Sequence, residues 1–225
     1  MIRINKIIRS RRKTYSLEVT RKGELLVRAP LFMTDQQIKN IVLEKSEWIV
    51  QKMELVRRRQ SEAPQHTFRD GDQFQLLGEN YPLITKSGQK SALSFADHTF
   101  VLDSRYLQSA ASIFESWYRK QARIHFSARI AELAPGLKVQ PKVLRISSAR
   151  TRWGSCSTRG TISLSWRLIM APTHIIDYVI IHELIHLRHP NHSAQFWAAV
   201  ETHYPDHKAA KLWLKANGTA LSLVD

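Results

Sequence analysis

The chain has 225 residues, 43% of them hydrophobic, which is enough for one globular domain or two small ones with a real core. Lysine and arginine outnumber aspartate and glutamate by 34 to 19, and this formal net charge of +15 favours phosphates or other polyanions as partners. The single cysteine, Cys156, excludes an internal disulfide framework, and without a signal-peptide core or a run of ~18 apolar residues we expect a cytoplasmic protein with no membrane span.

The positive charge is concentrated in the first quarter of the chain. Residues 1–60 hold 15 Lys/Arg against 6 Asp/Glu, with one basic cluster from Arg9 to Lys13 and another from Arg57 to Arg59. Such a region could bind nucleic acid, although no DNA- or RNA-binding motif accompanies the charge. A solvated basic face without a dedicated partner is the alternative interpretation.

The first hundred residues predict a β-rich region with one embedded helix. Alternating apolar residues predict a strand over 2–8 and a hairpin over 15–29 that Pro30 ends. Thr34, with Gln37 three residues later, has the pattern of a capping box and begins a helix over 35–60. A second hairpin over 74–83 and two short strands over 93–102 follow.

From residue 105 the pattern becomes helical. A long helix is predicted up to Pro135, then strands over 143–146 and 162–166, joined by a loop in which Gly154 indicates a bulge or a close backbone approach. Ser193 can cap a short helix, and a last helix ends at 217–218. We therefore expect an α+β protein with a β-rich region at 1–104 and a catalytic domain at 105–225.

The sequence HELIH at residues 182–186 lies in a predicted buried helix that begins near Pro172 and is ended by Pro190. Side chains four residues apart on a helix share one face, about 6 Å apart along the axis, so His182 and His186 could hold one metal ion. Glu183 is placed to take a proton from water on that ion. Buried ionisable groups are costly unless bound or paired, which favours a metal site over a solvated surface.

A catalytic zinc site usually has a third protein ligand, and four residues compete for this role: His189, His192, Glu201 and His203. His189 would lie too far along a straight helix from His182 to reach the same ion. His192 lies beyond the proline, where the chain can turn back. We therefore predict His192 as the third ligand, with Glu201 of the next helix as the reserve.

The segments RWGSC at 152–156, ISLSWRL at 162–168 and HELIHLRHPNHSAQFW at 182–197 resemble the YgjP-like family. Members of that family are zinc-dependent hydrolases with a metallopeptidase-like domain, similar to the SprT and Spartan proteases. The resemblance implies a zincin-like catalytic domain in which the HExxH helix lies beside a small sheet. It also implies His182, His186 and His192 as ligands of one Zn²⁺ ion, or another divalent metal, and Glu183 as the catalytic glutamate.

We therefore expect a zinc-dependent metallopeptidase with Glu183 as general base, and with Arg152 or Tyr178 assisting at the oxyanion or the substrate. Two alternatives stay open. One is a metal-dependent nucleotide phosphohydrolase or pyrophosphatase acting on an anionic substrate, and the other is a DNA-associated protease delivered by the basic N-terminal region. The expected substrate is thus a peptide, a protein or a nucleotide, and the sequence carries no signal for an oligomeric state.

Overall fold

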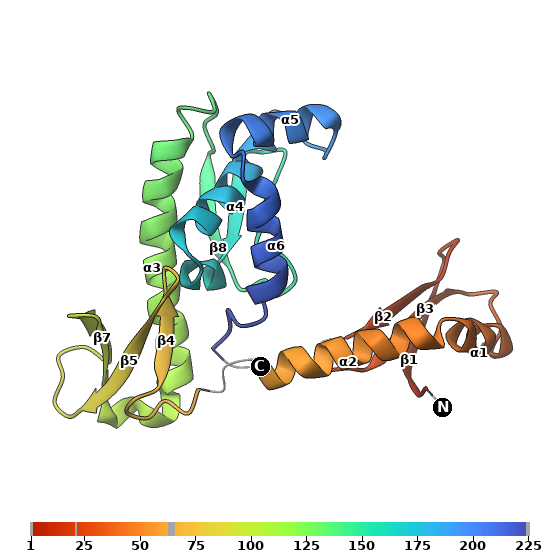
Figure 1. Cartoon of the computed structure of the whole chain (residues 1–225), viewed down its shortest axis with the longest axis horizontal. Coiled ribbons are helices and arrows are strands. Elements are labelled where there is room, and N and C mark those ends of the chain that lie inside the picture. Colours follow the sequence, from red (N-terminus) through yellow and green to blue (C-terminus); the bar gives the residue numbers. More distant parts are fainter. Residues whose placement is uncertain (1, 21, 63–65, 224–225) are drawn as a thin grey trace. The chain divides into compact units, whose positions relative to one another are not determined.

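The computed structural model describes residues 2–20, 22–62 and 66–223, and over these it is a mixed α+β protein with six α-helices and three small sheets (Figure 1). The chain divides into two compact units, Met1–Ala63 and Pro64–Asp225, each with its own hydrophobic core. Arg21 of the predicted first hairpin and the side chain of Arg59 lie outside the described residues. None of the helices in the described ranges has the length and apolar character that a bilayer crossing requires.

A three-stranded sheet and two helices form the first unit. β1 (Ile4–Ser10) pairs in parallel with β3 (Leu25–Pro30), and β2 (Ser16–Val19) pairs antiparallel with the other edge of β3, which confirms the predicted strand and hairpin. Apolar side chains from alternate positions of β3 and from both helices fill the core: Leu25, Val27, Ala29, Ile38, Val42 and Ile49.

The segment predicted as one helix over 35–60 is two helices, α1 (Asp35–Glu44) and α2 (Ser46–Glu62), so that prediction was wrong. The predicted capping box is confirmed: the Thr34 hydroxyl accepts from the Gln37 amide at 3.2 Å, and the Gln37 side chain accepts from the Thr34 amide at 2.8 Å. The break falls at Lys45. Neither glycine nor proline marks it, and the apolar spacing continues across it, so local sequence gives no sign of it.

The second unit contains two sheets and four α-helices. Its strands are β4 (Gln73–Leu76), β5 (Glu79–Lys86), β6 (Leu93–Ala96), β7 (Thr99–Asp103), β8 (Val143–Ser147), β9 (Gly154–Cys156) and β10 (Thr161–Ser165). They form one sheet of order β4-β5-β7-β6 and another of order β8-β10-β9. The α-helices are α3 (Ala110–Leu133), α4 (Thr173–Ile185), α5 (Ala194–His203) and α6 (His207–Asn217). Two short 3₁₀ helices, η1 (Ser104–Ser109) and η2 (Trp166–Met170), precede α3 and α4. Strand β9 lies within the segment that was predicted as a loop.

One core runs through the whole second unit and crosses residue 104, where the sequence placed a domain boundary. The ring of Phe114 on α3 lies 4.1 Å from that of Phe74 and 5.4 Å from that of Phe100, both in the four-stranded sheet. Helix α3 contacts both sheets (Figure 1). Because these strands share buried surface with α3, the chain divides at Ala63/Pro64, and the predicted region 1–104 is split between the two units.

Candidate metal centre

Helix α4 carries two of the predicted site histidines and the glutamate between them. Nine of its thirteen residues are buried, as the apolar pattern predicted. The helix begins directly after Pro172 but ends at Ile185, so His186 is its C-cap residue and the predicted continuation to Pro190 was wrong. The amides of residues 187–189 bond back to the carbonyls of Leu184 and Ile185 in a tight turn, which starts the reversal of the chain towards His192.

The rings of His182, His186 and His192 converge. Nε2 of His192 lies 3.1 Å from Nε2 of His182 and 3.1 Å from Nε2 of His186, and the ligand atoms of all three lie within 4.8 Å of one another. Three nitrogens bound to one zinc ion in tetrahedral geometry, each about 2 Å from it, lie about 3.3 Å apart. Nε2 of His192 carries at most one hydrogen, so it cannot donate to the nitrogens of both His182 and His186 at once. The lone pairs of these ring nitrogens therefore face a common centre. The donor set therefore fits a divalent ion.

The other ring nitrogen of His186 fixes which nitrogen is free for a metal. Nδ1 of His186 lies 3.0 Å from the carbonyl oxygen of His189. A carbonyl only accepts, so Nδ1 carries the proton and Nε2 keeps its lone pair, an arrangement common around metal-binding histidines. Residue His189, a competitor for the third ligand position, thus contributes its backbone to the site.

Burial keeps His182 and His186 neutral. Burial lowers the pKa of His182 to about 4, mainly because desolvation disfavours the charged ring. The charges of His186, His192 and Lys211 act in the same direction. Desolvation is also the main cause that lowers the pKa of His186. Neutral imidazole is the form that binds metals, so both rings are available as ligands at neutral pH. Nδ1 of His182 is buried without a hydrogen-bond partner in the described part of the chain.

Helix α5 supplies an aromatic wall behind the three rings. It begins where the predicted cap forms, with the Phe196 amide donating to the Ser193 hydroxyl at 3.4 Å. The Phe196 ring stacks on His186 at a centroid distance of 4.5 Å, and the Trp197 ring stacks on His192 at 5.7 Å. These contacts restrict ring rotation, so they hold the nitrogens in the convergent arrangement.

The side chain of Glu183 extends from α4 towards strand β9. Its side chain is buried, and this desolvation raises its pKa to about 7, while the charge of Arg152 acts in the opposite direction. A methyl group added at Gly154 would lie 2.5 Å from Oε1 and 2.6 Å from Cγ of Glu183, so glycine alone fits here without a shift of that side chain. The close backbone approach predicted at Gly154 is confirmed, and its cause is the Glu183 side chain.

Tyr178 and Arg152, the two residues predicted to assist, both lie near this carboxyl group. Tyr178 is buried one helical turn before His182, with its ring 6.0 Å from the His182 ring. Desolvation and then the charge of Glu183 raise its pKa, so its hydroxyl stays protonated. Arg152 is exposed, and its positive charge lowers the pKa of Glu183, against the effect of burial.

Sequence reasoning missed Lys211, which lies on α6 with its Nζ 5.4 Å above the centre of the Trp197 ring. The Trp197 ring in turn lies 5.9 Å from the ring of His182, and the charge of Lys211 is among the causes that lower the pKa of His182. The sequence shows only a lysine on an amphipathic helix, so no local signal could have identified it.

The remaining competitors for the third ligand position lie outside this group. Among the described residues, the set that could hold a metal ion comprises His182, His186 and His192, without Glu201, the predicted reserve. His203 and His189 line a separate small cavity of about 30 Å³.

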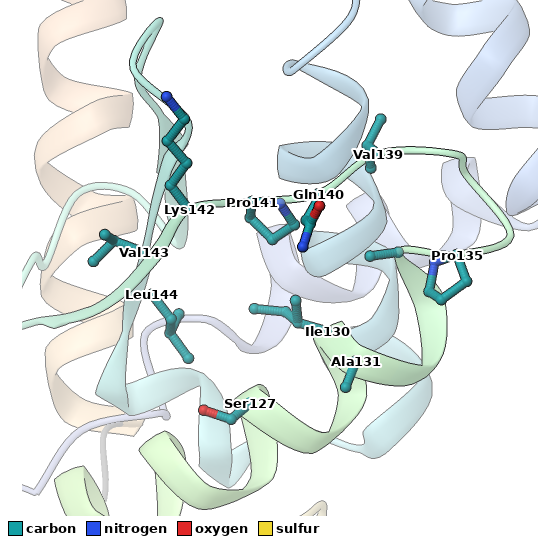
Figure 2. A pocket seen from close by; sticks show the side chains of 11 residues that line it. Ser127, Ile130, Ala131, Pro135, Val139, Gln140, Pro141, Lys142, Val143 and Leu144 are labelled. Carbon is teal, nitrogen blue, oxygen red and sulfur yellow. The ribbon is translucent and has the colours of Figure 1, made fainter.

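Figure 2 shows a different cavity, of about 510 Å³, between the end of α3 and the segment that leads into β8. Lys142 is the one charged side chain among the described residues that line it, and the wall is otherwise mostly apolar. The cavity therefore lacks the paired titratable groups that acid–base chemistry requires.

Comparison with known protein families finds a match over most of the chain. The sequence model of the family described as YgjP-like, metallopeptidase domain, matches residues 13–217. Among solved structures, the metallopeptidase zymogen abylysin of Pyrococcus abyssi is similar to 44% of this chain and 99% of its own, with 24% identity and a TM-score of 0.38. No curated protein matches the chain.

Proposed function

The chain belongs to the YgjP-like metallopeptidase family, and we propose that it is a zinc-dependent peptidase with its active centre on α4. One zinc ion would be held by His182, His186 and His192, with Glu183 as the general base. The observation that carries this proposal is the convergence of three ring nitrogens, with two contacts of 3.1 Å, next to a buried carboxyl group.

A bound zinc ion supplies Lewis acidity, lowering the pKa of a water molecule towards ~7 and polarising the carbonyl of the scissile bond. Glu183 accepts the proton of the attacking water and later donates it to the leaving amine. Burial raises the pKa of Glu183, and a carboxylate with a raised pKa is a stronger base.

Gly154 is a positioning residue for this general base. Its backbone lies in van der Waals contact with the Glu183 side chain and leaves no room for a β-carbon. The carboxyl group is therefore confined between α4 and β9, and proton transfer depends on such confinement.

Strand β9 is the proposed substrate-binding strand, and the substrate would bind along its outer edge. Gly154, Ser155 and Cys156 pair with β10 along one edge, and within the described sheets the other edge has no partner strand. An extended peptide can add to such an edge through backbone hydrogen bonds. A peptide bound there would run past Gly154 and bring a carbonyl group close to Glu183.

Tyr178 is the proposed donor to the developing oxyanion. It precedes His182 by four residues and His186 by eight, so all three side chains share one face of α4. Because its raised pKa keeps the hydroxyl protonated, Tyr178 can donate a hydrogen bond to the tetrahedral intermediate.

The Glu183→Gln variant tests the function. We expect it to retain zinc at the level of the wild type and to lose at least about a hundredfold in turnover, because the amide cannot accept the proton. Zinc-loaded wild type and variant should be incubated with denatured proteins and with nucleoside triphosphates. Turnover confined to the nucleotides, or undiminished proteolysis in the metal-loaded variant, would contradict the proposal.

A further inference from the structure

We propose that the peptide substrate carries an acidic side chain beside the scissile bond, and that Arg152 and Lys211 bind its carboxylate. The inference rests on the proposed peptidase function and adds to it the chemical class of the substrate. It comes from the position of two exposed cations on different elements next to the histidines and Glu183.

Arg152 is fixed close to the general base by the backbone that follows it. The Trp153 carbonyl accepts from the Ser165 amide at 2.8 Å, and Gly154 then lies against Glu183. The Trp153 ring also packs on the end of α6, because a methyl group at Gly218 would lie 2.7 Å from its Cζ2 atom. Arg152 therefore lies two residues before β9, the proposed substrate-binding strand, and is exposed to solvent.

Lys211 approaches the centre from α6, through Trp197. Its Nζ lies 5.4 Å from the centre of the Trp197 ring, and this ring stacks on His192 at 5.7 Å. A cation over an aromatic face is attracted by the ring, which restricts the ammonium group to the neighbourhood of the histidines. Lys211 is exposed, so a substrate can reach it.

Both cations are available for an external anion. Within the described part of the chain, neither Arg152 nor Lys211 forms a salt bridge with a carboxylate. The positive potential from these two side chains attracts an acidic residue and disfavours a basic one next to the bond. The arginine can also bind a carboxylate through two parallel hydrogen bonds.

Pairs of peptides that differ only in Asp against Asn, or Glu against Gln, beside the cleaved bond test this inference. For zinc-loaded wild type we expect kcat/KM to be about tenfold higher for the acidic member of each pair, mainly because its KM is lower. The ratio should fall as salt rises from 0.1 M to 1 M, because the Debye length shortens from about 10 Å to about 3 Å.

The variants Arg152→Gln and Lys211→Gln should each lower this ratio by about threefold to fivefold while retaining zinc. Arg123→Gln and Lys120→Gln remove the same charges from exposed positions of α3 and should leave the ratio unchanged. Binding of the same peptides to Glu183→Gln, measured by calorimetry, should show the same preference without turnover.

Each outcome bears on one claim. Equal cleavage of both members of every pair overturns the inference and leaves the peptidase function standing. The same loss in the α3 control variants as in Arg152→Gln and Lys211→Gln overturns the assignment to these two residues. If zinc-loaded wild type cleaves no peptide, or only nucleoside triphosphates, the proposed function itself fails.

Discussion

The substitution Gly154→Ala should disable the protein through a single added methyl group. The backbone at Gly154 does not have a positive φ angle, so alanine can adopt the same conformation without backbone strain. The new β-carbon would lie 2.5 Å from Oε1, 2.6 Å from Cγ and 2.8 Å from Cδ of Glu183. The change therefore acts on Glu183, the proposed general base, through steric contact alone.

The displacement follows from these distances. Carbon atoms pack at about 3.5–4.0 Å, so the Glu183 carboxyl group must move by about 1 Å. Glu183 is only 6% exposed, which leaves it little room to do so without shifting its neighbours. A misplacement of about 1 Å costs about a hundredfold in rate, and overpacking of this kind destabilises a fold by about 1–3 kcal/mol.

The assay compares kcat on a peptide, zinc content and thermal unfolding for the wild type and Gly154→Ala. We expect about a hundredfold lower kcat with zinc retained. Gly136→Ala is the matched control, because its added β-carbon would meet only the Leu133 carbonyl oxygen, at an ordinary 3.6 Å. A kcat within about threefold of the wild type in folded, zinc-loaded Gly154→Ala would refute the role given to this contact.

Three further predictions follow from the same structure. In metal-free protein the pKa of Glu183 is about 7 in the folded state and about 4.5 in the unfolded state. The folded state therefore holds the Glu183 proton more tightly. The wild type should therefore lose about 3 kcal/mol of unfolding free energy relative to Glu183→Gln as the pH rises from about 4.5 to about 7. Urea unfolding with a chelator at both ends of this range checks this, and a difference independent of pH would contradict it. Asp177→Asn breaks a two-bond ion pair in which Arg129 of α3 donates to Asp177 of α4 at 2.7 and 2.8 Å, and it should cost about 1–2 kcal/mol by urea unfolding. The exposed pair of Glu115 with Arg119 is the control, and Glu115→Gln should cost less than about 0.5 kcal/mol, so equal losses would contradict the assignment. Removing the proposed zinc ion with a chelator should lower the melting temperature by several degrees, because an ion held by the three histidines would bind only the folded protein, and re-addition should restore it. An unchanged melting temperature would contradict a tightly bound ion.

Much of the candidate site could be predicted because its signals are local. The four-residue spacing of His182 and His186 follows from helix geometry. His192 was predicted as the third ligand because it lies beyond the helix, although the helix ends at Ile185 and the chain begins to turn back before Pro190. The capping box at Thr34, the N-cap at Ser193 and the turn residues also placed most strands and helices. These patterns act within a few residues of one another, so the sequence displays them directly.

The features that were missed depend on contacts between distant segments. Strand β9 has three residues in a polar segment, and it forms because Ser155 and its neighbours pair with β10. Lys211 becomes part of the site only because α6 packs beside Trp197. The boundary placed at residue 104 was drawn where the pattern changes from strands to helices, whereas Phe74 and Phe114 show that both sides share one core.

Anomalous diffraction at the zinc absorption edge, from crystals grown with zinc, tests the central claim most directly. We predict a single anomalous peak per chain about 2.0–2.1 Å from Nε2 of His182, His186 and His192. A peak elsewhere in the molecule, or a zinc ion bound with His192 outside bonding distance, would contradict the account.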